Sequence, residues 1–501
     1  MNLNELFIRH IHNLLPINEA SAMLHAIESS EPVISVRFND SKGFMPPASL
    51  ERVPWCETGA YVRERPQFTF DPHFHAGSYY VQDASSMFIY HVIKNVVGKP
   101  VTYLDLCAAP GGKTTAALQA LPQGSIVVAN EIVTPRAQVL RENIIKWGLD
   151  NCMVTNDTPK TLGKLENAFD VIAADVPCSG EGMFRKDDEA VAQWSPQLVT
   201  QCAARQREIL ADIWPALKPD GLLIYSTCTY NLDENERMAL YIANELGASF
   251  VEIPVEQSWN ITGDLSCNAQ CTMDNAQRAV QPGNRIPCYR FLPHHTRGEG
   301  LFLCVLRKMN NAQSLMHNAQ FKPSKQKKQN TSTRVPKEAS SWLNDNYEIS
   351  EQNGIIFATK AEIGDKRSGI VNSQLSPLNS LLSTLSSQLS SLHVIKGLNL
   401  EIGTIKGNKI IPSHQLAMSH LLREGAFEKC EVDYHTAIAY LRGESITINA
   451  QRGFVLITYQ NAILGFVNNL GNRANNLYPK SWRILSTHLP DKPQVELVGH
   501  V

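Results

Sequence analysis

Two cysteines stand where an alternation of strands and helices would expose them. Cys178 comes shortly after an apolar segment that ends at Asp175, and Cys228 comes shortly after a second apolar segment, residues 221–226. In an open α/β sheet, residues just beyond the carboxyl ends of the strands line one crevice. We therefore expect the two thiols to lie in the same crevice.

A pair of thiols is suited to covalent catalysis on a pyrimidine base. C5 of cytosine is a poor nucleophile, but addition of a thiolate at C6 makes C5 an enamine carbon that can attack a methyl sulfonium. The adduct must then lose the C5 proton and expel the thiol, and a second thiol or a base nearby can assist. Asp175 is suited to face N3 and N4 of the ring. Lys113 could hold the carboxylate of Asp175 in place, and its positive charge could lower the pKa of a nearby thiol.

A third segment, Asp105 to Thr114, reads DLCAAPGGKT and lies between an apolar run and a helix-forming stretch. Strand, tight turn and helix in this order aim backbone N–H groups at a bound ligand. The segment ends like a phosphate loop, but the Walker pattern needs glycine at the position of Cys107, and G-x-G-x-x-G is absent as well. A P-loop NTPase is therefore disfavoured.

Acidic residues follow three of the expected strands: Glu131, Asp157 and Asp175. A carboxylate just after the second strand binds ribose hydroxyls in dinucleotide folds. A negatively lined pocket suits a cofactor with a ribose and a cationic centre better than a triphosphate. S-adenosylmethionine, which carries a sulfonium, an adenosine and an amino acid, has these features.

The elements that position these residues are expected from the apolar pattern. Strands are predicted at 101–106, 126–130, 152–155, 170–175, 221–226 and 301–306. Helices are predicted between strands, at 136–147 and from Cys202 to Leu217. Alternating strands and helices predict a mostly parallel sheet that is covered on both faces.

The chain before residue 80 has the pattern of a small α+β unit. Residues 4–15 and 17–29 are predicted helices, separated at Pro16, and 33–39 is a predicted strand. The polar face of that strand carries Arg37 and Asn39. These two side chains would either meet a phosphate and a base edge or form a solvated strand face.

The last third of the chain is different in composition. Residues 309–340 are rich in Asn, Gln, Ser and Lys, which indicates a linker whose lysines can also touch a polyanion. Ser376 to Leu392 has leucines at helical spacing, and Phe454 to Tyr459 is a predicted strand. Cys267 and Cys271 form a C-x3-C pair without matching histidines, which is weak evidence for zinc, and we expect no metal.

Bulk composition sets the class of protein. The 501 residues are 43% hydrophobic and 19% charged with a net charge of −2, which is typical of a globular protein of two to four domains. Its 11 cysteines are an odd count, and no secretory segment begins the sequence, so a disulfide scaffold is not expected. No apolar run is long enough to span a bilayer. We expect a monomer in the reducing cytoplasm.

Three motifs in order resemble the NOL1/NOP2/Sun family of RNA cytosine-5 methyltransferases. They are Asp105 to Thr114, Asp175 to Lys186 (DVPCSGEGMFRK) and Tyr225 to Thr229 (YSTCT). The GEGMFRK continuation and Gly77 to Asp83 (GSYYVQD) are similar to the bacterial, RsmF-like branch that modifies 16S rRNA. Shorter runs near Pro412, Tyr440 and Tyr478 resemble the PUA-like tail of that branch. The resemblance covers nearly the whole chain.

The resemblance implies a Rossmann-like class I methyltransferase domain with a small N-terminal α+β domain and a β-rich PUA-like C-terminal domain. The implied division is an RNA-recognition domain (1–90), a methyltransferase domain (91–308), a basic polar linker (309–340) and a PUA-like RNA-binding region (341–501). Cys228 is then the nucleophile and Cys178 assists release, with Asp175 on the cytosine and Lys113 beside it. The implied S-adenosylmethionine site is Cys107, Ala108, Ala109, Pro110, Gly111, Gly112, Lys113, Glu131, Arg136, Asp157 and Asp175.

The expected activity is S-adenosylmethionine-dependent formation of 5-methylcytidine, with 16S rRNA or the small subunit as substrate. Arg136, Arg185 and Lys186 would contact the RNA backbone or form an ordinary charged rim. The alternatives are the same chemistry on tRNA and a non-catalytic, RNA-binding ribosome assembly factor. A pure binder would need neither Cys178 nor Cys228. The target nucleotide and the exact role of the tail do not follow from the sequence, because Gly465 to Asn468 (GFVN) departs from the GWGK-like run of the family.

Overall fold

The computed structural model describes most of the chain. The described residues are 3–266, 285–310, 337–344, 347–360, 392–407, 409–486, 490 and 497. The predicted Cys267 and Cys271 pair, nearly all of the Ser/Leu-rich stretch 376–392 and most of the linker 309–340 lie outside them. Among the helices that are described, none is both long and apolar enough to cross a membrane.

The central layer is a nine-stranded sheet in the order β10-β12-β9-β8-β5-β6-β7-β15, with β11 paired to β12. Its strands are β5 (Thr102–Asp105), β6 (Ile126–Asn130), β7 (Cys152–Thr155), β8 (Phe169–Asp175), β9 (Leu217–Thr227), β10 (Ala248–Val251), β11 (Tyr289–Phe291), β12 (Leu301–Lys308) and β15 (Val394–Lys396). The five central strands run parallel, and the strands outside them are antiparallel. This arrangement confirms the predicted, mostly parallel sheet.

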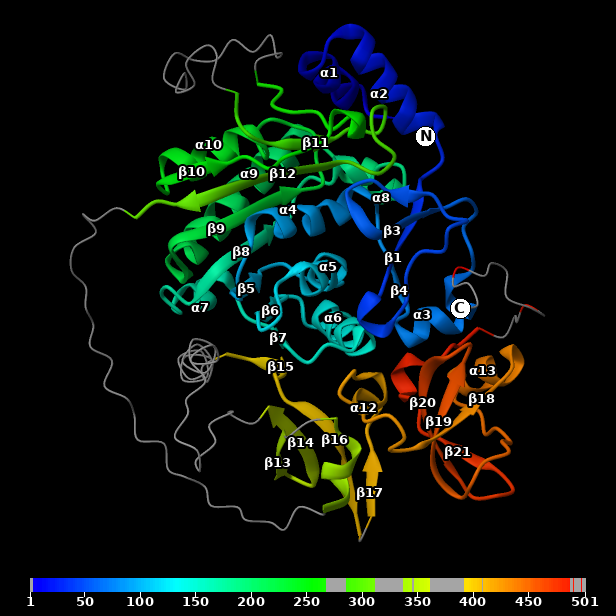
Figure 1. Cartoon of the computed structure of the whole chain (residues 1–501). Helices are drawn as coiled ribbons and strands as arrows, with labels where there is room; N and C mark the ends of the chain where they lie inside the picture. Colours follow the sequence, from blue (N-terminus) through cyan, green and yellow to red (C-terminus); the bar gives the residue numbers. More distant parts are fainter. Residues whose placement is uncertain are drawn as a thin grey trace, which may run out of the picture.

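Helices cover both faces of this sheet (Figure 1). They are α4 (Phe88–Val96), α5 (Gly112–Ala120), α6 (Thr134–Trp147), α7 (Pro159–Gly163), α9 (Pro196–Ile213) and α10 (Glu236–Asn244), whereas α8 (Asp188–Gln193) packs against the core of the N-terminal helices. Successive strand residues point to opposite faces. Tyr103 therefore joins the core under α4, α5 and α6, while Leu104 joins the core under α7, α9 and α10.

The N-terminal unit is a helical pair followed by a four-stranded antiparallel sheet in the order β2-β3-β1-β4. Its elements are α1 (Glu5–Leu14), α2 (Ile17–Ser29), β1 (Ile34–Phe38), β2 (Arg52–Val53), β3 (Cys56–Val62), α3 (Pro72–Ala76) and β4 (Tyr79–Val81). The two predicted helices and the predicted strand at 33–39 are all present. Both helices are amphipathic, and their apolar stripes form a core with Phe184 and Trp194 of the large domain.

Arg37 and Asn39 are fully buried, so neither predicted role for this strand face is correct. Arg37 lies over the Trp147 ring at 4.5 Å, and its guanidinium donates to the Gln82, Gln119 and Thr115 side chains and to the Gly112 carbonyl. Asn39 Nδ2 donates to the carbonyls of Gly77 and Trp147, both at 2.9 Å. These contacts hold β1 against α5 and the end of α6 rather than against RNA.

The C-terminal part contains two four-stranded sheets. One has the order β13-β14-β16-β17 and the other β18-β19-β20-β21. The elements are β13 (Tyr347–Gln352), β14 (Ile355–Lys360), β16 (Leu400–Lys406), β17 (Lys409–Pro412), α12 (His414–Met418), β18 (Glu428–Glu431), α13 (Tyr434–Leu441), β19 (Gly453–Tyr459), β20 (Ala462–Asn469) and β21 (Ala474–Asn476). The predicted strand at 454–459 is therefore confirmed as β19. Gly465 in β20 has φ +141°, and a Cβ there would lie 2.4 Å from the Tyr440 hydroxyl.

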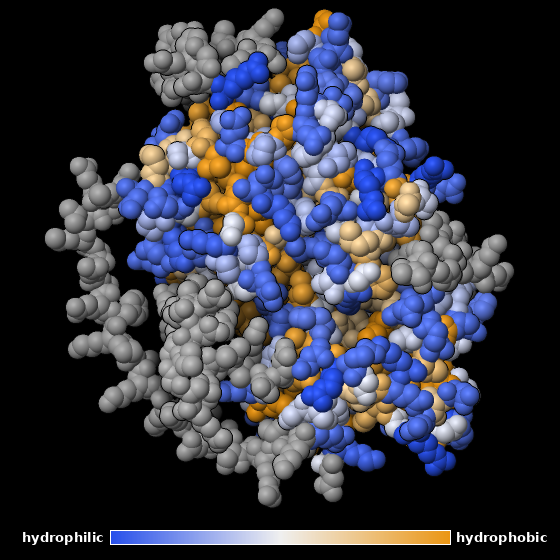
Figure 2. Space-filling view, in the orientation of Figure 1, coloured by the Kyte–Doolittle hydropathy of each residue, from blue (hydrophilic) through white to orange (hydrophobic). Residues whose placement is uncertain are grey.

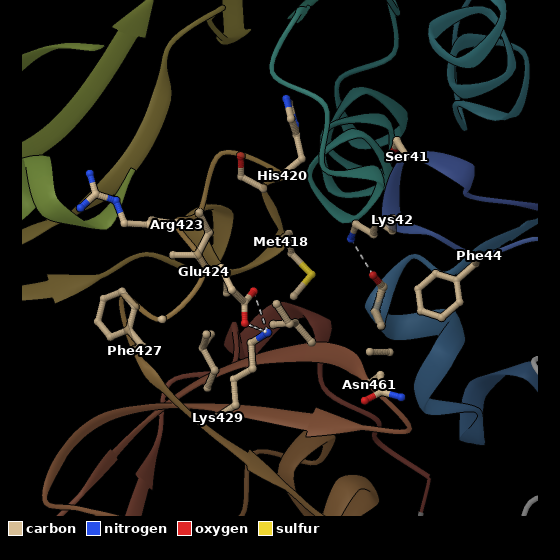
Figure 3. A pocket seen from close by; sticks show the side chains of 18 residues that line it. Ser41, Lys42, Phe44, Met418, His420, Arg423, Glu424, Phe427, Lys429 and Asn461 are labelled. Carbon is tan, nitrogen blue, oxygen red and sulfur yellow. Dashed lines mark hydrogen bonds and ion pairs between the residues drawn. The ribbon is translucent and has the colours of Figure 1, made fainter. Parts of the chain in front are cut away.

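A cavity of about 200 Å³ lies where the N-terminal unit meets the C-terminal part. Figure 3 shows Lys42 and Phe44 on one side of it and the segment from Met418 to Lys429 on the other. Lys42 Nζ already donates to two backbone carbonyls, at 2.7 and 2.6 Å, and Lys429 is ion-paired with Glu424 at 2.7 Å. The residues that line the cavity come from the N-terminal unit and the C-terminal part and include neither Cys178 nor Cys228, so the cavity is a joint between these two units.

Candidate active site

The loops after β8 and β9 bring the two cysteines together. These strands are parallel neighbours, with Asp175 in register with Ser226, so the residues that follow them leave the sheet side by side. The Sγ atoms of Cys178 and Cys228 are 3.2 Å apart, and both side chains are partly exposed. The structure thus places both thiols side by side at the carboxyl edge of the sheet.

The two sulfur atoms differ in their surroundings. The hydrogen bond with Cys228 and burial together raise the pKa of Cys178 well above its usual value. Cys178 therefore stays a thiol at neutral pH and can donate its proton toward the Cys228 sulfur. The backbone of Cys228 is fixed as well, because its carbonyl accepts from the Gly182 N–H at 2.9 Å.

A buried polar network supports the two cysteine loops, and the sequence did not reveal it. Glu234 accepts from the Ser179 N–H at 3.0 Å and from Gln206 Nε2 at 2.7 Å. Glu181 accepts from the Asn231 N–H at 3.0 Å and from its Nδ2 at 3.1 Å. Both glutamates are fully buried. Buried carboxylates with such bonds fix the backbone around them, so these residues position the loops on either side of the thiols.

Asp175 and Lys113 form an ion pair at the mouth of the crevice. Lys113 Nζ lies 2.8 Å from Asp175 Oδ2, and the Ser226 hydroxyl donates to Asp175 Oδ1 at 2.7 Å. Burial alone would lower the pKa of Lys113, but the attraction of the Asp175 carboxylate is the larger effect, so the pKa of the lysine is raised. The carboxylate is held from two sides in one orientation, beside the thiols.

Glu131 stands at the end of β6 with its side chain almost fully buried. Its Oε1 accepts from the Val133 N–H at 2.9 Å, whereas its Oε2 is buried without a hydrogen-bond donor and lies 3.5 Å from Arg136 Nη1. Arg136 also donates to the Ala109 carbonyl at 2.9 Å. A buried carboxylate oxygen that lacks a donor fits a ligand that brings hydroxyl groups, such as a ribose.

Asn130 ties together the loops that follow β5, β6 and β7, and sequence reasoning missed it. Its Oδ1 accepts from the Asp157 N–H at 2.9 Å, and its Nδ2 donates to the carbonyls of Leu106 and Asp157 at 3.1 and 3.0 Å. Its own carbonyl accepts from the Ala108 N–H at 2.8 Å. A single asparagine at the end of an apolar strand gave no signal in the sequence.

The loop from Cys107 to Lys113 turns the chain into α5. Cys107 packs against the core under α7, α9 and α10, and burial raises the pKa of its thiol. Gly111 has φ +113°, a conformation that favours glycine, and a Cβ at Gly112 would lie 3.3 Å from the Tyr80 ring. Lys113, in the first turn of α5, pairs with Asp175, so the N-terminus of α5 lies near the cysteine loops, where its backbone N–H groups can meet an anionic group.

Asp105 gives a pH-dependent stability that can be measured. It is fully buried, accepts from the Thr114 hydroxyl at 2.6 Å, and burial raises its pKa to about 7. An unfolded chain releases this proton near pH 4. Between about pH 4 and 7 the unfolded state binds fewer protons at this site, so stability falls as pH rises. The measurement is the change in the thermal midpoint of unfolding between pH 5 and pH 8. The wild type has a destabilising contribution from Asp105 over this range that Asp105→Asn lacks, so we expect the midpoint of the variant to change in a more favourable direction than that of the wild type. Exposed Asp212→Asn is the control and should follow the wild type.

The proposed contact of Arg185 with an RNA backbone is wrong. Its side chain is only 5% exposed, and its Nε donates to Glu299 Oε2 at 2.8 Å. Lys186 is 28% exposed and lies 3.3 Å from Glu299 Oε1. Both cations therefore neutralise Glu299 and hold the 298–300 turn beside the cysteine loops. Arg136 is more exposed, at 58%, and it donates to the Ala109 carbonyl.

One cluster of possible metal ligands occurs among the described residues, away from the crevice: Glu19, His294 and His295. Glu19 Oε2 lies 2.9 Å from His294 Nε2 and 2.7 Å from His295 Nε2. These are hydrogen-bond distances, whereas two ligands of one zinc ion at about 2.1 Å in tetrahedral geometry lie farther apart. The cluster joins α2 to the turn before β12, and we do not assign a metal to it.

Comparisons with known proteins agree on one family. Three family models match: 16S rRNA methyltransferase RsmB/F over residues 98–307, the N-terminal domain of 16S rRNA methyltransferase RsmF over 3–84, and the methyltransferase RsmF PUA domain over 427–484. Ribosomal RNA small subunit methyltransferase F of Salmonella newport is 28% identical over 446 residues, which are 86% of this chain and 84% of that protein. The protein of that name from Salmonella heidelberg gives the same figures.

A solved structure shows the same fold. The methyltransferase homolog protein from Pyrococcus horikoshii is 24% identical, with a TM-score of 0.50 over 61% of this chain and 95% of that one. At this identity the likeness concerns the fold alone. It agrees with the Rossmann-like sheet described above.

Proposed function

Because this chain belongs to the RsmB/F family of 16S rRNA methyltransferases, we propose that it transfers a methyl group from S-adenosylmethionine to C5 of a cytosine in 16S rRNA. The observation that carries the proposal is the pair of sulfur atoms 3.2 Å apart beside the Asp175–Lys113 ion pair. A ribose or base methyltransferase without a covalent step would need neither thiol.

The addition step uses Cys228 and the ion pair. The Cys228 thiolate adds to C6 of the cytosine, and the electrons of the C5–C6 double bond move toward N3. Asp175 faces N3 and N4 of the ring and passes a proton from its partner Lys113 to N3, and this proton neutralises the charge that develops there. C5 then carries the electron pair that attacks an electrophilic carbon.

The release step uses Cys178. After methylation, the bond between C6 and the Cys228 sulfur must break with its electrons returning to sulfur, and the C5 proton must pass to a base. Cys178 becomes that base when it gives its own proton to the departing sulfur, and it recovers a proton from C5. Cys178 stays protonated and its sulfur touches that of Cys228, so it can donate a hydrogen bond, or its proton, to the departing thiolate. This position suits a residue that assists release rather than one that attacks.

The cofactor supplies a methyl group on a sulfonium, and the chain offers matching groups around it. Glu131 would bind the ribose hydroxyls, because its buried Oε2 lacks a donor. Asp157 would bind the adenine, and the 107–113 loop with the α5 N-terminus would hold the amino acid end. Ile132, an apolar residue with 56% of its surface exposed directly after Glu131, would cover the adenine.

The substrate reaches this crevice as an exposed base, either in a single-stranded loop or flipped out of a helix. We assign RNA recognition to the N-terminal unit (1–90) and the PUA-like region (341–501), on either side of the methyltransferase domain. On the face drawn in Figure 2, hydrophilic residues cover much of the surface, and an apolar patch lies among them in the upper left and centre. A reaction on bacterial 16S rRNA belongs in the cytoplasm.

The test is a methylation assay with isotopically labelled S-adenosylmethionine and three substrates: 30S particles, naked 16S rRNA and bulk tRNA. Digestion to nucleosides identifies the product. We expect 5-methylcytidine from 16S rRNA, either free or in the particle. Label only in tRNA would overturn the substrate, and label in another nucleoside would overturn the chemistry. Cofactor binding without any methylated RNA would favour the non-catalytic assembly factor.

A further inference from the structure

The edge of the methyltransferase sheet is completed by a strand from far along the chain. β15 pairs antiparallel with β7, with Val394 in register with Thr155. In Figure 1, β15 lies beside β7 and leads on to the sheets of the C-terminal part. About 240 residues separate the two strands in sequence, so the contact joins the C-terminal region to the edge of the cofactor domain.

The segment around β15 is built into both faces of the sheet. Leu392 and Leu398 join the core under α7, α9 and α10, while Ile395 packs against the core under α4, α5 and α6. Lys396 is buried, and its Nζ donates to the Cys152 carbonyl at 2.8 Å. A strand with apolar contacts on both faces and a buried lysine anchored to its neighbour is a fixed part of the domain.

The segment reaches the cofactor crevice through its first residues. The His393 N–H donates to Asp157 Oδ2 at 2.9 Å, and the His393 carbonyl accepts from the Asn156 N–H at 3.0 Å. The Asp157 backbone is already fixed by Asn130. The side chain, by contrast, is held by a donor from the C-terminal region.

We propose that residues 392–398 are a positioning element for the cofactor, in which the His393 N–H sets the direction of the Asp157 carboxylate. This inference rests on the proposed function, because Asp157 is assigned there to the adenine. A carboxylate has about four lone-pair positions, so one donor from the protein orients it and leaves others for the ligand. The protein should therefore bind the cofactor more tightly when residues 392–398 are paired with the edge of the sheet.

The experiment compares two variants at one position. His393→Pro removes the backbone donor, whereas His393→Ala changes the side chain and keeps the N–H. Loss of one hydrogen bond to a charged group typically changes a binding constant by roughly tenfold. We expect His393→Pro to bind S-adenosylmethionine about tenfold more weakly by calorimetry and to raise its KM by a similar factor with kcat nearly unchanged. His393→Ala should match the wild type.

A double-mutant cycle separates positioning from general damage. In an Asp157→Ala background, the proline substitution should cause no further loss of affinity. Equal affinity of the proline and alanine variants, or the same extra loss in both backgrounds, would overturn the inference. If His393→Pro does not fold, the double variant Leu392→Ala/Leu398→Ala replaces it, because it loosens the segment from the sheet without introducing proline. This double variant should lower the affinity for S-adenosylmethionine when Asp157 is present and should have no effect in the Asp157→Ala background. A wild-type protein that does not bind S-adenosylmethionine would instead overturn the proposed function.

Discussion

Cys178→Ala is expected to remain covalently bound to its RNA after one round of methylation. The nucleophile Cys228 and the Asp175–Lys113 pair are intact in this variant, so addition and methyl transfer proceed. The thiol that touches the departing sulfur is missing, so release stalls. We expect most of the enzyme to accumulate as a protein–RNA adduct and multiple turnover to fall by at least a hundredfold.

Denaturing gel electrophoresis with end-labelled RNA measures this adduct directly. Cys228→Ala is the matched variant and should form none, because it cannot add to C6. Cys430→Ala, on β18 of the C-terminal part, should behave as the wild type. An adduct in Cys228→Ala but not in Cys178→Ala would reverse the two roles, although both thiols would still belong to the reaction.

Asp175→Asn is expected to reduce kcat by about a thousandfold while leaving the fold intact. The amide has the same shape and can still accept from Ser226. It carries no charge to pair with Lys113, and it cannot pass a proton to N3 as the thiolate adds to C6. The loss therefore falls on the addition step.

Single-turnover methylation and adduct formation by Asp175→Asn should fall together, because the defect precedes both. Ser226→Ala removes one hydrogen bond to the same carboxylate and keeps its charge, so we expect a loss of only about tenfold. A normal single-turnover rate in Asp175→Asn would show that Asp175 has no part in activating the ring.

The sequence predicted the central sheet and the placement of the thiols because both depend on local signals. Apolar runs marked β5 to β9, and parallel strands necessarily present their carboxyl ends at one edge. That rule led from Cys178 and Cys228 to a shared crevice. The roles of the two cysteines came only from the family resemblance and stay predictions.

Contacts between residues that lie far apart in the sequence could not be predicted from it. Arg37 looked like a surface residue of a strand, yet the Gln82, Thr115 and Gln119 side chains that surround it come from segments 45 to 82 positions later. Arg185 looked like a contact for RNA, but Glu299 lies beside it in the fold. Neither pairing leaves a periodic pattern that sequence reasoning can detect.

β15 shows a limit of the same kind. Three residues carry too little signal to assign a strand, and the expected division placed them in the PUA-like region. In the fold they form the edge of the methyltransferase sheet, beside Asp157. The boundaries of the expected domains stay a prediction, and this strand is a contact that crosses them.

The most direct test of the account is to trap the wild-type enzyme on 16S rRNA that contains 5-fluorocytidine. Fluorine at C5 cannot leave as a proton does, so the methylated adduct should persist. Digestion and tandem mass spectrometry should then find a Cys228 peptide joined to a cytidine that carries both fluorine and a new methyl group. An adduct at Cys178, an adduct without the methyl group when cofactor is present, or no adduct despite normal methylation of unmodified RNA would contradict the account.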